Sequence, residues 1–417
     1  MPLRKRNLPD SHLGDTVLKD GTTRLQTYQR TRCSCLRKWT FYGLLLWCSL
    51  MVAGYFLSPF HAIKCEISIL ELKGPLTSNY KLAQGTRIPN LPGPECVVED
   101  ENGNLYTGLA DGRVVRIQPT KDGSFENAKV ENLTDGKVTN PLPATTHKLG
   151  NARPSGLRLH GDNLFVVDCV YGLYSINIRN LSFSMLVQIS DVFPVLKFPN
   201  DLDISSNGNF VYFTDVDDDY SVAQIMYGVL SGKCSGRLLE YNISSKKLRV
   251  VTSQLCGANG VQVSIDKKSV IVSEMYRNRV TWIDILTGKH IRSVQMPMMP
   301  DGLTKINNNN YWIAGSQVPN SFAKFLFGTP MLRQSLAGFV PHDVLAIFVF
   351  VCSFDFRHNI VVEINDQGKI IHSMYDPYGN LTYGLAHATQ LHDGRIALAS
   401  YIAHFIGIVD PNILNIN

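Results

Sequence analysis

The alternation of apolar and polar positions is the main signal in the body of the chain. Residues 261–265 alternate with the two-residue period of a half-buried strand. A polar turn at 266–268 separates them from a second apolar run. Asn259-Gly260 is a pair that favours tight hairpin turns, yet it lies before the first strand and not between the two. The pattern therefore predicts a hairpin here, and Asn259 is free for some other role.

The same pattern recurs along the body of the chain. Each instance has a small or proline-led turn, an alternating strand, a polar turn and a second strand. The six instances begin at Pro94, Pro154, Pro199, Ala258, Pro300 and Tyr383. They are separated by roughly 40–60 residues, except that the last interval is lengthened by an insert. Such a period is typical of β-propeller blades, so the sequence predicts an all-β fold, a six-bladed β-propeller.

A short polar residue stands just before the inner strand of five repeats. Since inner strands line the central channel, these side chains should share one rim of it. They are Glu95, Ser155, Asn200, Asn259 and Asp301. Turn chemistry explains Asn-Gly or Asp-Gly in one or two repeats but does not explain Glu95. Ca²⁺ binds carboxylate and amide oxygens, so a calcium site and a set of turn-forming residues both remain open.

The insert, Pro319–Phe356, carries few charges. Its apolar residues on either side of Pro330 predict one or two short apolar helices. The apolar run Val344–Cys352 is too short to cross a membrane, and we expect it to resume as the outer part of a blade.

A second apolar feature, the uncharged run Trp39–Phe60, is 22 residues long, enough for a helix to span a bilayer. A signal peptide is the alternative, but the preceding segment is long and no small-x-small cleavage site follows. Lys and Arg precede the run, so the positive-inside rule places residues 1–38 in the cytosol. The sequence thus predicts a single-pass type II protein of the plasma membrane or endomembrane (ER or Golgi). Residues 61–417 would form the extracellular or lumenal propeller.

The charge distribution argues against a nucleic-acid partner. The formal charge of the chain is +5, but residues 1–38 alone carry nine basic and three acidic side chains, a net +6. The remaining residues are close to neutral, which does not suit a phosphate backbone.

Glycosylation acceptors and cysteines agree with an oxidising compartment for the body. Four Asn-X-Ser/Thr sequons all lie there: Asn132, Asn180, Asn242 and Asn380. Six cysteines also lie beyond the apolar run, with no spacing typical of a zinc site. They allow fifteen pairings, among which the sequence does not choose.

Several long motifs in the same order resemble one known family. They include GPE at 93–95, RPSGLR at 153–158, NDLDIS at 200–205, ANGVQVS at 258–264, MPDGL at 299–303 and HDGRIALASY at 392–401. Residues 64–410 resemble the strictosidine synthase-like branch of six-bladed propellers. Its relatives include paraoxonases, regucalcin and gluconolactonases, which are calcium-dependent hydrolases of esters and lactones. The resemblance implies that Glu95, Asn200, Asn259 and Asp301 hold Ca²⁺. It also implies that the insert covers the channel mouth, either as a lid over an apolar pocket or merely packed on the propeller face.

The chain departs from those relatives at three positions. Ser155 stands where paraoxonases have a histidine near the base. Cys96 follows Glu95 where paraoxonases have an acidic residue of a second, structural calcium site, although Asp201 remains. His387 stands near the position of the glutamate of plant strictosidine synthases, so the plant condensation is not expected.

These features predict calcium-dependent hydrolysis of aryl or acyl esters or lactones, with a small apolar substrate. Ca²⁺ would polarise the carbonyl, and His387 is the candidate base, against the alternative of a structural histidine. No G-x-S-x-G motif occurs, which disfavours a serine nucleophile. The competing hypothesis is a non-catalytic propeller that binds a protein or lipid partner at the membrane.

Overall fold

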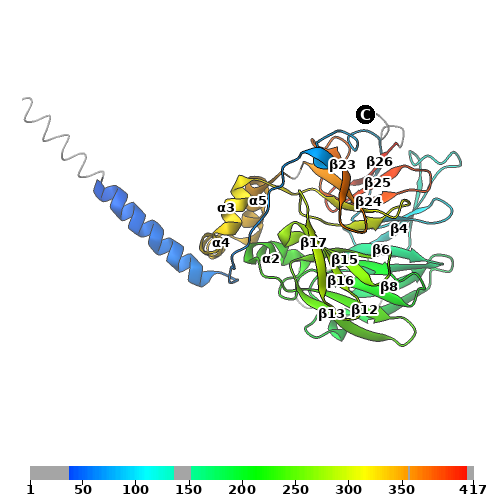
Figure 1. Cartoon of the computed structure of the whole chain (residues 1–417), viewed down its shortest axis with the longest axis horizontal. Helices are drawn as coiled ribbons and strands as arrows, with labels where there is room; N and C mark the ends of the chain where they lie inside the picture. The colour runs from blue at the N-terminus through cyan, green and yellow to red at the C-terminus, as the bar shows by residue number, and fades with distance from the viewer. Residues whose placement is uncertain (1–36, 136–151, 356, 411–417) are drawn as a thin grey trace, which may run out of the picture.

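The structure, a computed structural model, describes residues 37–135, 152–355 and 357–410. The expected tail at 1–38 therefore lies, apart from Arg37 and Lys38, outside the described residues. A long apolar helix projects from a body of strands, and a group of short helices lies between the two (Figure 1). The body is the predicted six-bladed β-propeller.

Six antiparallel sheets of four strands form the blades. The first blade holds β2 (Val97–Glu99), β3 (Leu105–Gly108), β4 (Val114–Gln118) and β5 (Lys129–Asn132). The second holds β6 (Pro154–His160), β7 (Asn163–Asp168), β8 (Gly172–Asn177) and β9 (Phe183–Gln188). The third holds β10 (Pro199–Ile204), β11 (Phe210–Asp215), β12 (Gly236–Asn242) and β13 (Lys247–Leu255). The fourth holds β14 (Ala258–Val263), β15 (Ser269–Glu274), β16 (Arg279–Asp284) and β17 (His290–Gln295). The fifth holds β18 (Leu303–Lys305), β19 (Tyr311–Gly315), β22 (Asn359–Ile364) and β23 (Ile370–Asp376). The sixth holds β24 (Leu385–Gln390), β25 (Ile396–Ser400), β26 (Phe405–Val409) and β1 (Thr86–Pro89). The first strand of each blade contacts the first strand of the next all the way round, so these six strands line the channel.

The ring is closed by a strand from the start of the body. β1 pairs antiparallel with β26, with Thr86 opposite Ile408. The sixth blade therefore combines residues from both ends of the propeller, and it has no separate outer strand of its own.

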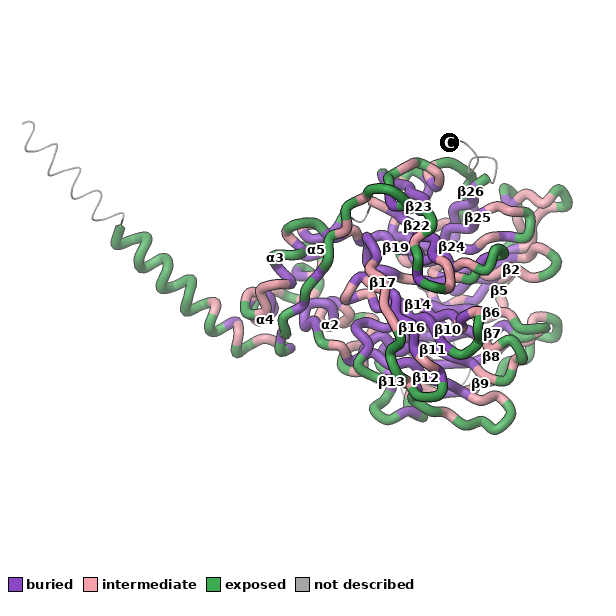
Figure 2. Tube along the Cα trace, viewed as in Figure 1, coloured by how far each residue is buried: buried purple, intermediate pink, exposed green. Residues whose placement is uncertain are grey.

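Buried residues follow the strands of the body (Figure 2), and their apolar side chains form clusters between neighbouring blades. Between the fourth and fifth blades, for example, Trp282 of β16 and Tyr311 of β19 are fully buried in one cluster with Ile271 and Met296. The alternation of buried and exposed residues is largely lost in these strands, because neighbouring blades cover both faces of each sheet.

The channel strands are irregular where they meet the rim. The pairing register shifts between Pro154 and Gly156, between Pro199 and Leu202, between Ala258 and Val261, and between Leu385 and His387. Such β-bulges redirect side chains and are common next to binding sites. Asn259-Gly260 thus lies in a bulge and not in a turn, and the hairpin turn falls at 264–268, which includes the predicted residues 266–268.

Glycine follows the polar rim residue because the next blade approaches closely there. The Gly260 amide donates to the Asp301 carbonyl oxygen at 3.1 Å. A Cβ atom on Gly260 would overlap that oxygen and the Leu303 nitrogen, and a Cβ on Gly302 would overlap Ala386 and His387. The glycines therefore permit contact between blades, and their neighbours in sequence carry the polar groups.

The insert forms helices, but more of them than the sequence predicted. Three lie between β19 and β22, flanked by the short pair β20 (Val318–Pro319) and β21 (Phe354–Asp355): α3 (Ser321–Gly328), α4 (Pro330–Ala337) and α5 (His342–Ser353). The expectation that Val344–Cys352 is a strand was wrong, since this run is most of α5. Its Val- and Phe-rich composition suits strands, but Leu345 and Val349, one helical turn apart, pack into the apolar cluster beneath the helix. Together with α2 (Ile225–Ser231), these helices form what we call the cap.

The apolar helix spans Arg37–Leu57 and is long and apolar enough to cross a membrane. Its last turns rest on the cap: a Cβ on Gly54 would overlap Ser335 and Phe339, and one on Gly338 would overlap Gly54. The Gln334 side chain of α4 donates to the Tyr55 carbonyl oxygen at 3.1 Å and accepts from the Ala62 amide at 3.0 Å.

A buried arginine joins the segment after this helix to the cap. The Arg333 guanidinium donates to the carbonyl oxygens of Ile63 at 2.5 Å and Phe327 at 3.1 Å, and also to that of Leu230. It has no ion-pair partner among the described residues, and burial lowers its pKa to about 10. Three separate segments thus meet on one side chain.

One disulfide, Cys234–Cys256, occurs in the described part of the chain. It ties the loop before β12 to the loop that leads into Asn259. The other described cysteines, Cys48, Cys65, Cys96, Cys169 and Cys352, are free. The six cysteines of the body thus form one disulfide, not the three that each of the fifteen pairings would contain.

The close approach at the rim yields a stability prediction. Gly260→Ala should lower the free energy of unfolding by about 2–4 kcal/mol, because the added methyl group overlaps backbone that has no room to move. Gly328→Ala is the matched control: apart from its chain neighbours and the backbone of its own helix, no atom lies within 4 Å of its Cβ position, so it should be close to neutral. Denaturant melts of the full chain in detergent measure both, and equal stability of the two variants would contradict this packing.

Candidate functional site

Four predicted residues from four blades meet in one pocket at the channel rim. Glu95 precedes β2, Asn200 lies in β10, Asn259 in β14, and Asp301 precedes β18. The pocket has a cavity volume of about 10 Å³, room for one small ion or water molecule, and is lined by Glu95, Cys96, Ser155, Asn200, Asp201, Asn259, Asp301, Gly302, Ala386 and His387. The repeat pattern therefore correctly indicated which side chains converge.

Glu95 is fixed by an arginine that the sequence argument did not single out. Arg153 donates to Glu95 Oε2 through Nε at 3.1 Å and Nη2 at 2.6 Å. The same guanidinium donates to the carbonyl oxygens of Gly93 and Tyr401. Glu95 Oε1 accepts from the Asn200 amide nitrogen at 3.3 Å. Arg153 thus neutralises and orients one carboxylate oxygen and leaves the other facing its neighbours in the pocket.

Asn259 presents an amide oxygen without a partner. Its side chain is 5% exposed, and its Nδ2 contacts the Met275 sulfur at 3.7 Å. The Oδ1 atom is buried and has no hydrogen-bond donor among the described residues. A buried polar atom without a partner costs about 1–3 kcal/mol, so this acceptor is suited to a ligand.

Asp301 is a half-buried carboxylate with no Lys or Arg in contact among the described residues. Burial raises the pKa of Asp301 well above its usual value, and the charges of Glu95 and Asp201 raise it further. A hydrogen bond with Asn259 and the charge of Arg153 oppose this shift without cancelling it. A cation in the pocket would restore the ionised form.

The donor set fits a hard divalent cation. Carboxylate oxygens of Glu95 and Asp301 and amide oxygens of Asn200 and Asn259 are the ligands that Ca²⁺ prefers, and no sulfur or imidazole is required. Of the two carboxylates, only Glu95 has a charged partner. The unpartnered oxygen of Asn259 and the unpaired charge of Asp301 both call for the same kind of ligand.

A second arginine occupies the channel beneath the pocket. Arg158 donates to the carbonyl oxygens of Leu157 at 2.7 Å and Leu303 at 3.0 Å. It also contacts Asp201 at 3.4 Å and Cys96 Sγ at 3.6 Å. A fixed guanidinium thus lies between Cys96 and Asp201.

His387 lines the pocket, but hydroxyl groups engage both ring nitrogens. Thr389 Oγ1 donates to the Val97 carbonyl oxygen at 2.6 Å and so accepts from Nδ1 at 3.1 Å. Nε2 is then unprotonated and accepts from Thr304 Oγ1 at 2.9 Å. Burial and the nearby Arg158 charge hold the pKa of His387 well below its ordinary value. The imidazole is neutral at physiological pH.

The other polar and sulfur groups at the rim are engaged. Ser155 Oγ donates to the Asn200 carbonyl oxygen at 2.6 Å, which holds the second blade against the third. Burial raises the pKa of Cys96 to about 12 and that of Cys169 well above its usual value, so both remain thiols. The RPSGLR motif could have drawn attention to Arg153, a charged residue directly before a strand whose first residues are buried.

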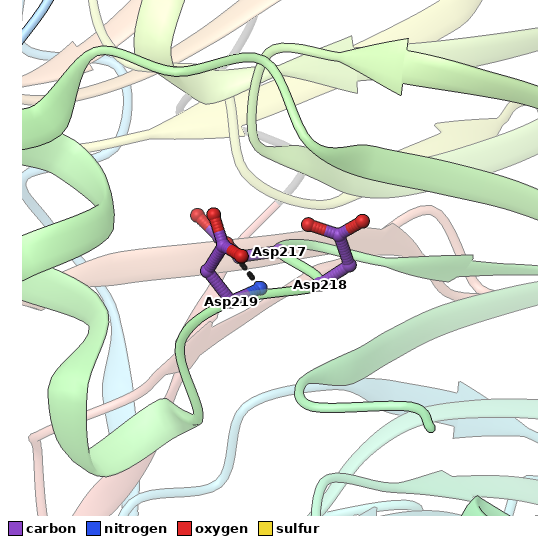
Figure 3. Close-up of side chains that lie close together, drawn as sticks. All are labelled: Asp217, Asp218 and Asp219. Atoms are coloured by element: carbon purple, nitrogen blue, oxygen red, sulfur yellow. Dashed lines mark hydrogen bonds between the residues drawn. The ribbon is translucent and has the colours of Figure 1, made fainter. Parts of the chain in front are cut away.

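An acidic cluster outside the pocket also has one buried oxygen without a hydrogen bond, Asp218 Oδ1, but the Lys233 ammonium lies 4.0 Å from it. Asp217, Asp218 and Asp219 lie close enough together to share an ion (Figure 3). Asp217 already accepts from Ser235 Oγ at 2.7 Å and from its own loop, and Lys233 forms an ion pair with Asp219 at 2.5 Å. These contacts hold the loop that carries the three aspartates in place.

The cap is built on the loops that carry the pocket residues. One apolar cluster joins Leu326 and Phe327 of α3 and Val349 of α5 to Phe198 and Met299. Phe198 and Met299 lie two residues before Asn200 and Asp301. The insert therefore lies over the rim that bears the site, in agreement with the position implied by the resemblance.

Comparison with known protein families identifies the class of propeller to which the chain belongs. The family described as strictosidine synthase matches residues 200–284, and strictosidine synthase-like, N-terminal, matches residues 74–117. The two matches contain Glu95, Asn200 and Asn259. The chain is thus a six-bladed propeller of the strictosidine synthase-like class.

The relatives define the family more closely. Adipocyte plasma membrane-associated protein of Rattus norvegicus is 31% identical over 349 residues, which cover 80% of this chain and 88% of that protein. The chain belongs to the family of adipocyte plasma membrane-associated proteins.

Solved structures are similar in fold alone. A luciferin-regenerating enzyme has a TM-score of 0.48 at 12% identity, with 77% of this chain and 92% of that chain covered. A calcium-binding protein, regucalcin, from Agrobacterium tumefaciens has a TM-score of 0.47 at 10% identity, with 78% and 93% covered.

The site geometry yields a calcium prediction. A ligand that binds only the folded state at a hundredfold excess over its Kd stabilises it by about 2.7 kcal/mol. Ca²⁺ should therefore raise the melting temperature of the wild type, and more at pH 8 than at pH 5, because protons compete for the Asp301 carboxylate. Asp301→Ala should abolish the rise, whereas Asn259→Asp keeps an oxygen in place and should retain it. Calcium-independent melting of the wild type would rule out this site.

Proposed function

We propose that the chain is a calcium-dependent hydrolase of aryl or acyl esters or lactones. The observation that carries the proposal is the unpartnered, buried Oδ1 of Asn259, placed with Asp301 and Glu95 at the channel rim. Ca²⁺ bound by Glu95, Asn200, Asn259 and Asp301 would supply Lewis acidity toward a carbonyl oxygen.

Fixed side chains and hydrogen bonds preorganise the pocket for a charged group. Arg153 fixes Glu95, and the blade-to-blade bond from Gly260 to the Asp301 carbonyl oxygen fixes the backbone of the facing side. Arg158 holds a permanent positive charge below the pocket. Preorganised charges of this kind need little rearrangement as a reaction proceeds, which is where enzymes gain most of their rate.

His387 is the proposed general base. Thr389 holds its proton on Nδ1, so Nε2 carries the lone pair that accepts a proton from water. Nε2 would exchange its bond with the Thr304 hydroxyl for one with that water. The lowered pKa of His387 keeps the imidazole in the basic form at neutral pH, at some cost in base strength.

The apolar cap beside the rim, rather than the small polar pocket itself, suits an apolar acyl or aryl group. The side chains that join the cap to the rim are Phe, Leu, Val and Met. A charged substrate would gain nothing from this cluster, and an aromatic or acyl group would gain roughly 25 cal/mol per Å² of apolar surface buried.

A non-catalytic propeller that binds a protein or lipid partner is the second candidate. Two observations favour it: threonine hydroxyls already engage both nitrogens of His387, and the hydroxyl of Ser155 is bonded to backbone. In that case the rim site would be purely structural.

Turnover separates the two candidates. The full chain in detergent should hydrolyse phenyl acetate, and a calcium chelator should abolish the activity. His387→Gln should lower kcat by about 10²–10⁴, while Thr304→Val frees Nε2 and should change it only a few-fold. Turnover that survives chelation would refute the calcium role. Absence of turnover on aryl esters and lactones would favour the non-catalytic propeller.

We further propose a type II orientation, with the propeller glycosylated outside the cytosol. Asn132, Asn180 and Asn380 are exposed and Asn242 is half-buried, so glycan attachment is sterically open. In sealed microsomes, a tag at residue 1 should be digested by added protease while the glycosylated body stays protected. Protection of the tag together with digestion of the body would reverse the orientation.

A further inference from the structure

The outer face of α5 is apolar and exposed. Val344, Ile347, Phe348 and Val351 recur with helical spacing and are 56%, 67%, 44% and 62% exposed. The opposite face, with Leu345 and Val349, is buried in the cap. A helix that is apolar on every side is normally enclosed by protein or lipid, so this stripe lacks its partner in the isolated chain.

The stripe continues onto α3. Phe348 contacts Phe322, with ring centroids 6.2 Å apart, and Phe322 contacts Phe325 at 6.3 Å. Phe325 is itself half exposed. Charges are scarce: the only charged residue of α5 is Asp343, in its first turn, and the only one of α3 is Lys324. The result is one contiguous apolar surface, which we call the cap stripe.

The position of the long apolar helix indicates what covers the cap stripe. α4 contacts this helix at Gly54, inside the apolar run and before the helix ends at Leu57. The cap therefore reaches the depth at which the proposed membrane span is still in the bilayer. Figure 1 places α3, α4 and α5 between the end of that helix and the propeller. α3 contacts both α4 and α5, so the cap stripe belongs to the same rigid group.

We propose that the cap stripe inserts into the bilayer leaflet that faces the propeller. This is the leaflet from which the chain's own membrane-spanning helix emerges. Apolar side chains at such an interface gain hydrophobic free energy, and the near absence of charge removes the opposing cost. The cap would then hold the pocket-bearing rim against the membrane surface, so that its ligands are lipid-soluble molecules drawn from the bilayer. The inference rests on the proposed membrane span, but it does not require that the pocket hydrolyses anything.

Photocrosslinking in a bilayer tests this placement. A benzophenone amino acid is placed at position 347 of the full chain, which is reconstituted in nanodiscs of phosphatidylcholine. The control is position 286: Leu286 is also apolar and 86% exposed. It lies in the turn after β16, and the direction of that strand puts the turn on the propeller face opposite the cap. Irradiated adducts are identified by mass spectrometry.

Position 347 should give phospholipid adducts at least tenfold more often than position 286. A second probe at position 325, on α3, should label lipid too, and it guards against a local folding defect at 347. Equal labelling at 347 and 286, or adducts to a second copy of the chain at 347, would overturn the proposal. The readout requires no turnover, so failure here and failure of the hydrolase proposal are separate results.

Discussion

The close contact between neighbouring inner strands at the channel rim is the constraint on which the site depends. Where Gly260 meets Asp301 and Gly302 meets Ala386, backbone touches backbone, and any side chain would force the blades apart. The same bulges that bring the strands together turn Asn200 and Asn259 toward the axis. Packing and ligand placement are therefore one arrangement, and a change in either disturbs the other.

Charge inside the channel is balanced by arginines rather than by solvent. Arg153 is paired with Glu95, and Arg158 lies beside Asp201 and Asp203. Burying a carboxylate without a partner is costly, which is why the pKa of Asp301, the one left unpaired, is raised so far. A single strand, β6, and the residue before it supply both guanidinium groups, so the second blade carries much of the electrostatic design of the pocket.

Features that recur from blade to blade could be predicted from the sequence, whereas features that occur only once in the fold could not. The six-bladed fold, the convergence of Glu95, Asn200, Asn259 and Asp301, and the helical nature of the insert all followed from periodicity. The secondary structure of Val344–Cys352 could not be read in that way, because an apolar run of Val and Phe suits a strand and a buried helix equally. Nor could local pattern reveal Arg158 or the threonine partners of His387, since those contacts join residues of different blades. The Cys234–Cys256 pair likewise depends on two loops that meet only after folding.

The pairing of β1 with β26 has a consequence for how the protein is made. Thr86 must find Ile408, 322 positions later (408 − 86), before the sixth blade is complete. At typical synthesis rates of about 5–20 residues per second, β1 waits roughly 15–65 s for its partner. During that time β1 is an unpaired edge strand and can accept a wrong neighbour. Quality control of the nascent chain should therefore act on the ring before it closes, and truncations that remove β26 should be held back while every earlier blade is intact.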